Sequence, residues 1–507
     1  MSTSNPAKMH LKVKCEDSAT EIFIIDGRFN LCDRGIGYTE TELEPGIYKV
    51  KVRAGFETYE QHVIVSDHDE SLTIPPFSFV SPAPLAGTAK THEFHMGAAE
   101  VGSKNPDLVK GHGSSIFIFS RDWTSQTQSS AAPPNIPNPG LGLSLREMNG
   151  DVIADLTTAG KRSDSWEPWV SFNVELEPGC YRLNLRLPKG GSIEQTLVAC
   201  SGWQTQVFLL QSYYDGTDAD TKRADLQGAS IQLAPLDMGF KSDNPLWRLS
   251  ELARLGLANE RKVLSKDLRE MLVGKFENPM LGLYGAHLLL LEAEPDMKLL
   301  NEVVDNLHKL LPSGHPDLDA LDLFLKRVAP AKFEVPPMLR KSWTHIVNAT
   351  AENPQIVPPD SLAAEAALHQ WGSGTWLLWQ HEEAQASTQR GLETIGKVAV
   401  MLSNAEVMLR SRLRTATLEG QFEKTDSPFA AISKLRAKRK KRALPAAVRD
   451  LMPPQTLKGA DPQRRPLAQL NEQDVNHLVQ SLCIPRANLE RIIKKLETDT
   501  EEETEES

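Results

Sequence analysis

Hydrophobic and polar positions alternate in short runs along the first half of the chain, as they do in half-buried β-strands. One series lies between residues 9 and 90, where Gly, Pro and Asp separate the runs, and a second lies between residues 116 and 211. The expected strands are LKVKC, EIFIID, IYKVKV and QHVIV in the first series and IFIF, LGLSLREM, WVSFNVEL, CYRLNLRL, IEQTLVAC and TQVFLLQ in the second. The pattern predicts two β-sandwich-like domains, at residues 1–90 and 91–235.

One sequence repeat links the two regions. The stretch Glu42–Val50 recurs 133 residues later as Glu175–Leu183, and each copy places Tyr just after a Glu-Pro-Gly turn. Pro fixes φ at the second position of such a turn and Gly accepts a positive φ at the third, so we expect a tight turn entering a strand whose Tyr faces the core. The repeat indicates two copies of one sandwich module.

This LxPGxYxVxV stretch resembles the PEGA-type and transthyretin-like β-sandwich modules of bacterial proteins, over roughly residues 10–70 and 141–211. The resemblance implies modules that serve as spacers and binding surfaces. An ordinary structural sandwich without a ligand is the alternative.

From Asn244 onward the apolar positions follow a helical period. Asn244 before Pro245 and Asn278 before Pro279 are typical of helix starts, and short connections between the later helices favour antiparallel neighbours. The pattern predicts a helical array at residues 236–335 and a Trp-rich helical domain at residues 336–421. Strands followed by helices indicate a multidomain α+β protein with segregated halves, which we expect to fold separately.

Two helical segments, KFENPMLGLYGAHLLL and LLPSGHPDLDAL, resemble a module of bacterial proteins encoded beside caspase-like or trypsin-like proteases. The resemblance implies a protease as a partner and a role in conflict or antiphage signalling.

Four of the nine tryptophans lie between residues 343 and 379. Tryptophan anchors many protein interfaces, so Trp371, Trp376 and Trp379 are candidate partner-binding residues. We expect Trp376 and Trp379 to share one face of a helix. Packing within the core is the alternative.

The net charge of −11 is unevenly distributed, because residues 433–496 carry fifteen basic and five acidic side chains while residues 497–507 carry seven acidic ones and no basic one. Residues 422–469 contain several prolines and predict an extended, exposed linker that proteases cut. The acidic composition of residues 498–507 predicts a disordered tail. The linker's candidate polyanion-binding residues are Lys438, Arg439, Lys440, Lys441 and Arg442.

The last module, residues 470–497, reads as two helices whose spacing resembles a helix-turn-helix. Its expected inner face is formed by Leu478, Val479, Leu482, Ile484, Leu489 and Ile492. Arg486, Asn488, Arg491 and Lys495 would then point outward, towards nucleic acid. Cys483 replaces the glycine usual in the turn. A helical hairpin that docks on protein is the alternative.

The remaining chemistry is sparse. Five scattered cysteines without a CxxC pair favour a reducing compartment, and the absence of an apolar leader or membrane stretch predicts a cytoplasmic protein that does not bind membranes. The common phosphate, dinucleotide, zinc and serine-hydrolase motifs are missing, so the sequence assigns no catalytic residue, cofactor or metal.

The function we favour from sequence is a non-catalytic protein-binding adaptor or effector of a bacterial, protease-linked antiphage system, with a cleavable or mobile basic C-terminal module. One alternative is a nucleic-acid-binding regulator that uses residues 433–496. The other is an unrecognised hydrolase.

Overall fold

The computed structural model describes residues 8–89, 91–122, 138–163, 168–214, 221–261, 263–273, 276–327, 332–381 and 472–494. The chain divides into two compact units. The first comprises residues 1–387 and 475–489, and it contains both sandwiches and most of the helices. Of the second unit, the structure describes residues 472–474 and 490–494.

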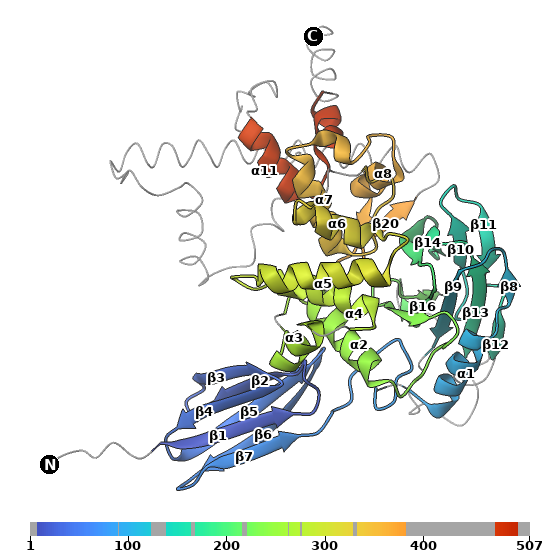
Figure 1. The fold of residues 1–507 in the computed structure, drawn as a ribbon. Helices are drawn as coiled ribbons and strands as arrows, with labels where there is room; N and C mark the ends of the chain where they lie inside the picture. The colour runs from blue at the N-terminus through green and yellow to red at the C-terminus, as the bar shows by residue number, and fades with distance from the viewer. Residues whose placement is uncertain are drawn as a thin grey trace, which may run out of the picture. The chain divides into compact units, whose positions relative to one another are not determined.

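The N-terminal sandwich, blue in Figure 1, is one seven-stranded sheet with the order β6-β5-β2-β3-β4-β1-β7. Its strands are β1 Met9–Cys15, β2 Glu21–Ile25, β3 Leu31–Ile36, β4 Tyr38–Leu43, β5 Gly46–Ala54, β6 Glu57–Val65 and β7 Glu70–Ile74. A single residue pair, Ile36 and Tyr38, joins β3 to β4, so the sheet folds over at this point. It encloses its own apolar core, which includes Leu11, Ile24 and Val50.

The second sandwich has two sheets, with the orders β11-β10-β14-β15-β20-β19 and β12-β13-β9-β16-β17. Its strands before residue 236 are β8 Leu108–Val109, β9 Ser114–Arg121, β10 Leu143–Glu147, β11 Val152–Asp155, β12 Lys161–Ser163, β13 Trp169–Leu176, β14 Gly179–Arg186, β15 Ser192–Ala199, β16 Trp203–Tyr213, β17 Lys222–Ala224 and β18 Ser230–Pro235. Helix α1, Glu93–Lys104, packs on β13. This helix lies within a segment for which the sequence predicted only β structure.

The strands of the two sandwiches pair in the same way. In the first, β1 is antiparallel to β4 and parallel to β7; in the second, β9 is antiparallel to β13 and parallel to β16. The repeat forms the turn from β4 to β5 in the first sandwich and the turn from β13 to β14, between two sheets, in the second. The hydroxyl of Tyr48 donates to the Glu44 carbonyl at 2.8 Å, just as that of Tyr181 donates to the Glu177 carbonyl at 2.8 Å. Both copies of the repeat therefore belong to modules with matching topology.

The conformation expected of the turn glycines is wrong. Neither Gly46 nor Gly179 has a φ in the left-handed region, because each begins an extended strand. A β-carbon on Gly179 would meet no atom within 4 Å, whereas one on Gly140 would overlap the Leu156 carbonyl oxygen.

These surroundings predict opposite outcomes for two alanine substitutions. We expect Gly179→Ala to change the free energy of unfolding by less than about 0.5 kcal/mol, since alanine fits the backbone and the space. Gly140→Ala is expected to destabilise the protein by about 1–3 kcal/mol, because the backbone of Leu156 has to move. Urea denaturation of the two variants measures the difference, and equal stabilities would contradict it.

The helices follow the second sandwich in the chain. They are α2 Pro245–Ala258, α3 Lys266–Val273, α4 Pro279–Leu289, α5 Met297–Leu310, α6 Pro316–Phe324, α7 Arg340–Thr350, α8 Leu362–Leu368 and α11 Glu472–Leu482, with a 3-10 turn at Pro354–Ile356. The predicted starts of α2 and α4 are confirmed, because the side chains of Asn244 and Asn278 accept hydrogen bonds from the first-turn amides of Leu246 and Leu281.

The second sandwich and the helices share one apolar core, so the expectation that the two halves fold separately is wrong. Leu197 and Val207 of the sandwich belong to the same buried cluster as Leu252 and Leu283 of α2 and α4. Hydrogen bonds cross the boundary as well, from the Tyr284 hydroxyl to the Ile231 carbonyl at 3.0 Å. Most of the N-terminal sandwich has a core of its own, although Ala19 and Ala54 belong to the shared cluster.

Residues 370–381 form a hairpin of two strands where the sequence predicted helix. These strands are β19 Gln370–Trp371 and β20 Leu378–His381, and β20 extends the sheet of the second sandwich by pairing with β15. Gly372 and Gly374 have φ angles of 67° and 117°, which a helix does not allow. The Trp-rich segment is therefore partly a continuation of the second sandwich.

Candidate protein-binding surface

The tryptophans nominated for partner binding lie mostly in the core. Trp376 and Trp379 are fully buried, and the Trp376 indole donates to the Ala229 carbonyl at 2.7 Å. Trp371 is half-buried and stacks against Tyr214. As folded, Trp376 and Trp379 offer no surface to a partner, and core packing describes their position.

The C-terminal segment 475–489, which we call the C-terminal hairpin, has most of the predicted inner face. Leu478, Val479, Ile484 and Leu489 are buried, and Leu482 is half-buried. Two of the four residues expected to face nucleic acid point elsewhere. Asn488 is buried with its amide donating to the Ala364 carbonyl, and the Arg486 guanidinium donates to the Ala351 carbonyl at 2.8 Å. The outward placement of these two side chains is therefore wrong.

The other predicted polyanion-binding residues divide into two groups. Arg491 is exposed, on the helix formed by residues 486–494. Lys495 and the linker residues Lys438, Arg439, Lys440, Lys441 and Arg442 lie outside the described residues. Cys483 has a φ of 56°, so it occupies the turn in the conformation that usually selects glycine.

A different surface emerges on the N-terminal sandwich, at the loop between β2 and β3. The Asp26 carboxylate accepts hydrogen bonds from the amides of Arg28 and Asn30, both at 2.8 Å, and from the Asn30 side chain at 3.0 Å. These bonds, the side-chain one first, lower the pKa of Asp26. The loop is therefore closed by an ionised carboxylate at neutral pH.

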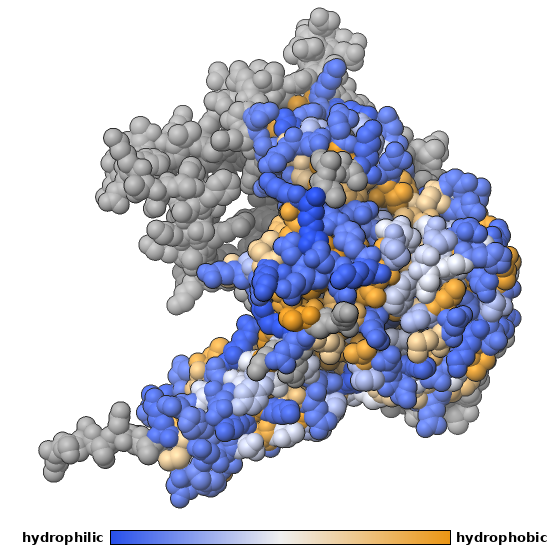
Figure 2. Space-filling model, viewed as in Figure 1, coloured by the Kyte–Doolittle hydropathy of each residue, from blue (hydrophilic) through white to orange (hydrophobic). Residues whose placement is uncertain are grey.

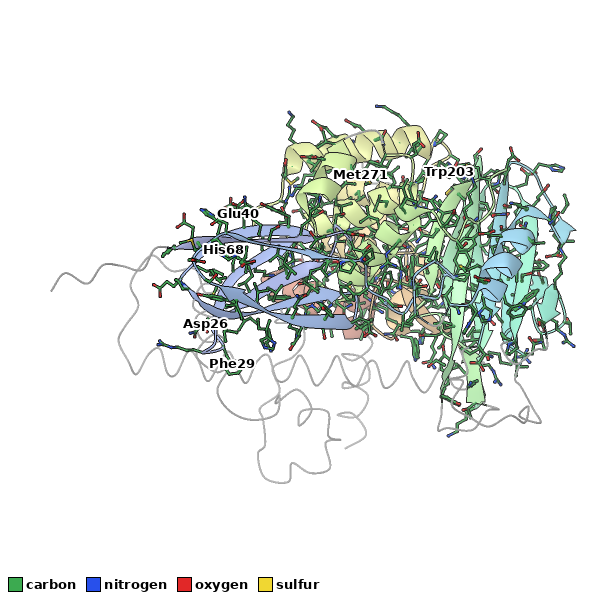
Figure 3. The ribbon with its side chains drawn as sticks, turned by 90° about the horizontal axis from the view of Figure 1, so that it is seen from below. Asp26, Phe29, Glu40, His68, Trp203 and Met271 are labelled. Atoms are coloured by element: carbon green, nitrogen blue, oxygen red, sulfur yellow. The ribbon has the colours of Figure 1, made fainter. Side chains whose placement is uncertain are left out.

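This loop displays an aromatic ring. Phe29 has a φ of 66°, a conformation that costs a bulky residue strain, and its side chain is 83% exposed. Figure 3 shows Asp26 and Phe29 close together at one end of the sandwich. Phe29 is therefore a large apolar side chain that is exposed to water on a strained backbone.

Three exposed aliphatic side chains adjoin the loop on the outer face of the sheet. Ile47 of β5 pairs across the strands with Ile64 of β6, and Leu31 begins β3. Each is more than half exposed, and a β-carbon on Gly27 would lie 3.9 Å from the Ile47 carbonyl oxygen. We call Phe29, Leu31, Ile47 and Ile64 the Phe29 surface.

Charged residues border the Phe29 surface along the same strands. Glu60 forms ion pairs with Lys49 at 3.0 Å and with Lys51 at 3.5 Å, and these bonds lower the pKa of its carboxyl. Figure 2 shows orange apolar side chains lying among blue polar ones on this sandwich. An apolar centre with a charged rim is the usual anatomy of a protein interface.

The sequence carried a signal for two of these residues that went unused. In β5 the core-facing positions are Tyr48, Val50 and Val52. Ile47 therefore occupies an outward-facing position, where the alternation of the strand predicts a polar residue. Ile64 likewise breaks the alternation of β6. Phe29 left no such signal, because its position depends on the loop geometry.

A buried His–Ser pair on α4 and α7 has the residue types of hydrolase chemistry. His287 Nε2 lies 3.0 Å from the Ser342 hydroxyl, and the His287 ring stacks on His345 with centroids 5.5 Å apart. Both members of the pair are fully buried, and within the described part of the chain His287 Nδ1 has no hydrogen-bond partner that would orient the ring. This placement suits packing better than attack on a substrate.

The two stacked histidines predict loss of stability in acid. Burial lowers the pKa of His345 to about 4 and holds that of His287 well below its ordinary value, so both are neutral in the folded protein. The unfolded chain takes up protons below about pH 6.5, and folding stability is therefore lost as the pH falls from 6.5 towards 4.

For His345 alone the loss amounts to about 3 kcal/mol at pH 4. Urea denaturation between pH 7 and 4 measures it. His345→Phe, whose ring would pack on Phe324, is expected to flatten the pH dependence. Identical pH profiles for the wild type and the variant would contradict the assignment.

Within the described residues, no helix has both the length and the apolar character needed to cross a bilayer. In the same ranges no three His, Cys, Asp or Glu side chains gather in a way that could hold a metal ion.

No protein family and no curated protein matches the sequence. Among solved structures the chain is similar to the Bacillus anthracis TIE protein, at 12% identity over 38% of this chain and 31% of that one, with a TM-score of 0.15. The match spans about a third of that structure's length and carries no argument about fold or function.

Proposed function

We propose that this chain is a protein-binding adaptor whose partner docks on the Phe29 surface. The observation that carries the proposal is the strained, 83% exposed Phe29, fixed by the Asp26 carboxylate beside three exposed aliphatic side chains. Strained backbone persists where the surrounding structure enforces it, and such positions concentrate at binding sites.

The composition of the surface favours a protein as the ligand. Aromatic and aliphatic side chains at the centre of an interface stabilise the complex when a partner buries them. Charged side chains at the rim orient the partner. The loop is held rigid by the Asp26 hydrogen bonds, so binding requires little further ordering of the backbone. The resemblance of residues 275–290 and 310–321 to proteins encoded beside caspase-like or trypsin-like proteases makes such a protease the first partner to test.

The test uses the full chain and a purified protease encoded beside its gene. Phe29→Ser is expected to weaken binding about 10–100-fold, as truncation of a central anchor does. Phe56→Ser is the matched control, because Phe56 is also well exposed but lies at the opposite end of β5 and β6 from Ile47 and Ile64. Titration calorimetry measures both affinities. Equal losses of affinity for the two variants would contradict the assignment of the Phe29 surface as the binding site.

A second variant tests the rigidity of the loop. Asp26→Ala removes three hydrogen bonds without touching the apolar side chains, so it should weaken the same interaction by increasing the disorder that binding must remove. The expected signature is a less favourable binding entropy with an unchanged thermal stability of the second sandwich. An unaltered affinity would show that preorganisation of the loop plays no part.

A further inference from the structure

Strand β6 is a long edge of the N-terminal sheet, and among the described strands it pairs with β5 alone. It is the terminal strand in the order β6-β5-β2-β3-β4-β1-β7, it spans nine residues, and it pairs with β5 without a register shift. All but its last residue are exposed or half-exposed. Natural proteins usually shield such an edge with a proline, a bulge, inward-facing charges or a covering segment, since its open backbone groups pair readily with another strand.

The sequence of β6 is complementary to itself about Gln61. In an antiparallel pair centred on that residue, Glu60 of one copy lies opposite His62 of the other, and Tyr59 lies opposite Val63. An acid–base pair and an aromatic–β-branched pair are both favourable across strands. Moving the centre to residue 60 would place two glutamates opposite each other, which is destabilising.

The same register keeps the faces of the sheet continuous. Tyr59, Val63 and Val65 lie on the core side of β6, while Glu60 and Ile64 lie on the outer side with Ile47. Pairing about Gln61 joins outer positions to outer positions and core positions to core positions. A two-fold axis through Gln61 therefore satisfies the backbone and both faces together.

We propose that β6 pairs antiparallel with β6 of a second copy of this chain, centred on Gln61. The dimer joins two seven-stranded sheets and presents two Phe29 surfaces. A partner with two sites then binds with an avidity that exceeds the affinity of one surface. The inference does not rest on the proposed function, because β6 pairing uses backbone groups and the pairs Glu60–His62 and Tyr59–Val63.

The experiment is sedimentation of the full chain over a range of concentrations, with a pair of charge variants. His62→Glu places a carboxylate opposite Glu60 twice in each dimer and is expected to raise the dimer dissociation constant at least about 10-fold. The double variant Glu60→His/His62→Glu restores an acid opposite a histidine and should restore the dimer. Within each chain either variant still puts an acid beside the Lys49 and Lys51 side chains of β5.

The outcomes are distinct. Dimer formation that falls with His62→Glu and returns with the double variant supports the register, because only pairing centred on Gln61 brings residues 60 and 62 together. A monomeric wild-type chain at all concentrations overturns the proposal. So does a dimer that both variants leave unchanged, since it would use another surface. Phe29→Ser should not alter the dimer, so failure here is separate from failure of partner binding.

Discussion

Glu251→Ala is expected to destabilise the protein by about 3–5 kcal/mol. Glu251 and Arg254 of α2 are 0% and 3% exposed, and the carboxylate accepts two hydrogen bonds from the guanidinium, at 2.6 and 2.9 Å. It also accepts from the hydroxyls of Ser81 and Ser230. Removing the carboxylate leaves a buried, uncompensated cation, and this drives the loss of stability.

Two comparisons isolate that cause in urea denaturation. Glu302→Ala removes a carboxylate from an exposed pair with Lys298 on α5 and should cost less than about 0.5 kcal/mol. The double variant Glu251→Leu/Arg254→Met removes both charges and should recover part of the stability lost in the single variant. A loss below about 1 kcal/mol for Glu251→Ala would contradict a dry, buried ion pair.

The position of Glu251 also explains why the helices do not fold apart from the second sandwich. Its two serine partners belong to the segment after β7 and to β18, so one carboxylate ties helix, strand and connecting segment together. No periodicity marks this residue in the sequence, because a buried acid on a helix looks like an exposed one until its partners are known. The shared core was unpredictable for a similar reason, because the apolar pattern of a helix does not identify the element that it packs against.

Local patterns predicted what local forces determine. Alternation located β1, β2, β5 and β6 of the first sandwich and β9, β10 and β13 to β16 of the second, but it missed the remaining strands, most of them shorter. Asn before Pro located the starts of α2 and α4. The hairpin of β19 and β20 was missed because its sheet partner, β15, lies about 180 residues earlier in the chain. Short segments such as residues 378–381 take their conformation from the neighbour they pair with.

The C-terminal residues show the same limit. The inner face of the hairpin was predicted from spacing, and the burial of Leu478, Val479 and Leu489 confirms it. The direction of Arg486 and Asn488 was not predictable, since it depends on α7 and α8, which receive them. Helix spacing alone cannot distinguish a helix that reads DNA from one that docks on its own chain.

Leu489→Asp is expected to detach the C-terminal hairpin completely. Leu489 is fully buried, and an unpaired carboxylate in its place costs several kcal/mol. The docked hairpin is further held by the Gln370 amide donating to the Cys483 carbonyl and by Arg486 donating to Thr350 and Ala351. Those bonds are single and open to water once the apolar contact is lost, so they do not retain the hairpin.

Alkylation of Cys483, followed by mass spectrometry of its peptide, reports detachment. In the docked state burial raises the pKa of this thiol and limits access to it, so its reaction is slow. Exposed Cys32 supplies an internal reference for the rate. Leu489→Asp should raise the Cys483 rate at least about 10-fold, while Gln480→Asp, which adds the same side chain at an exposed position of α11, should not. Equal rates in the two variants would mean that Leu489 does not hold the hairpin.

The docked hairpin also changes what cleavage of the predicted linker at residues 422–469 would achieve. In the intact chain the covalent connection gives the hairpin an effective concentration that dilution of the protein does not change. A cut by a sequence-specific protease, at a recognition site introduced after Thr425, turns docking into a bimolecular equilibrium. The fragments should therefore elute together from a sizing column at high protein concentration and separate on dilution, whereas cut Leu489→Asp should separate at every concentration. Cleavage thus releases the module only where the protein is dilute, and a wild-type fragment that separates even when concentrated would show that the hairpin contacts are too weak to matter.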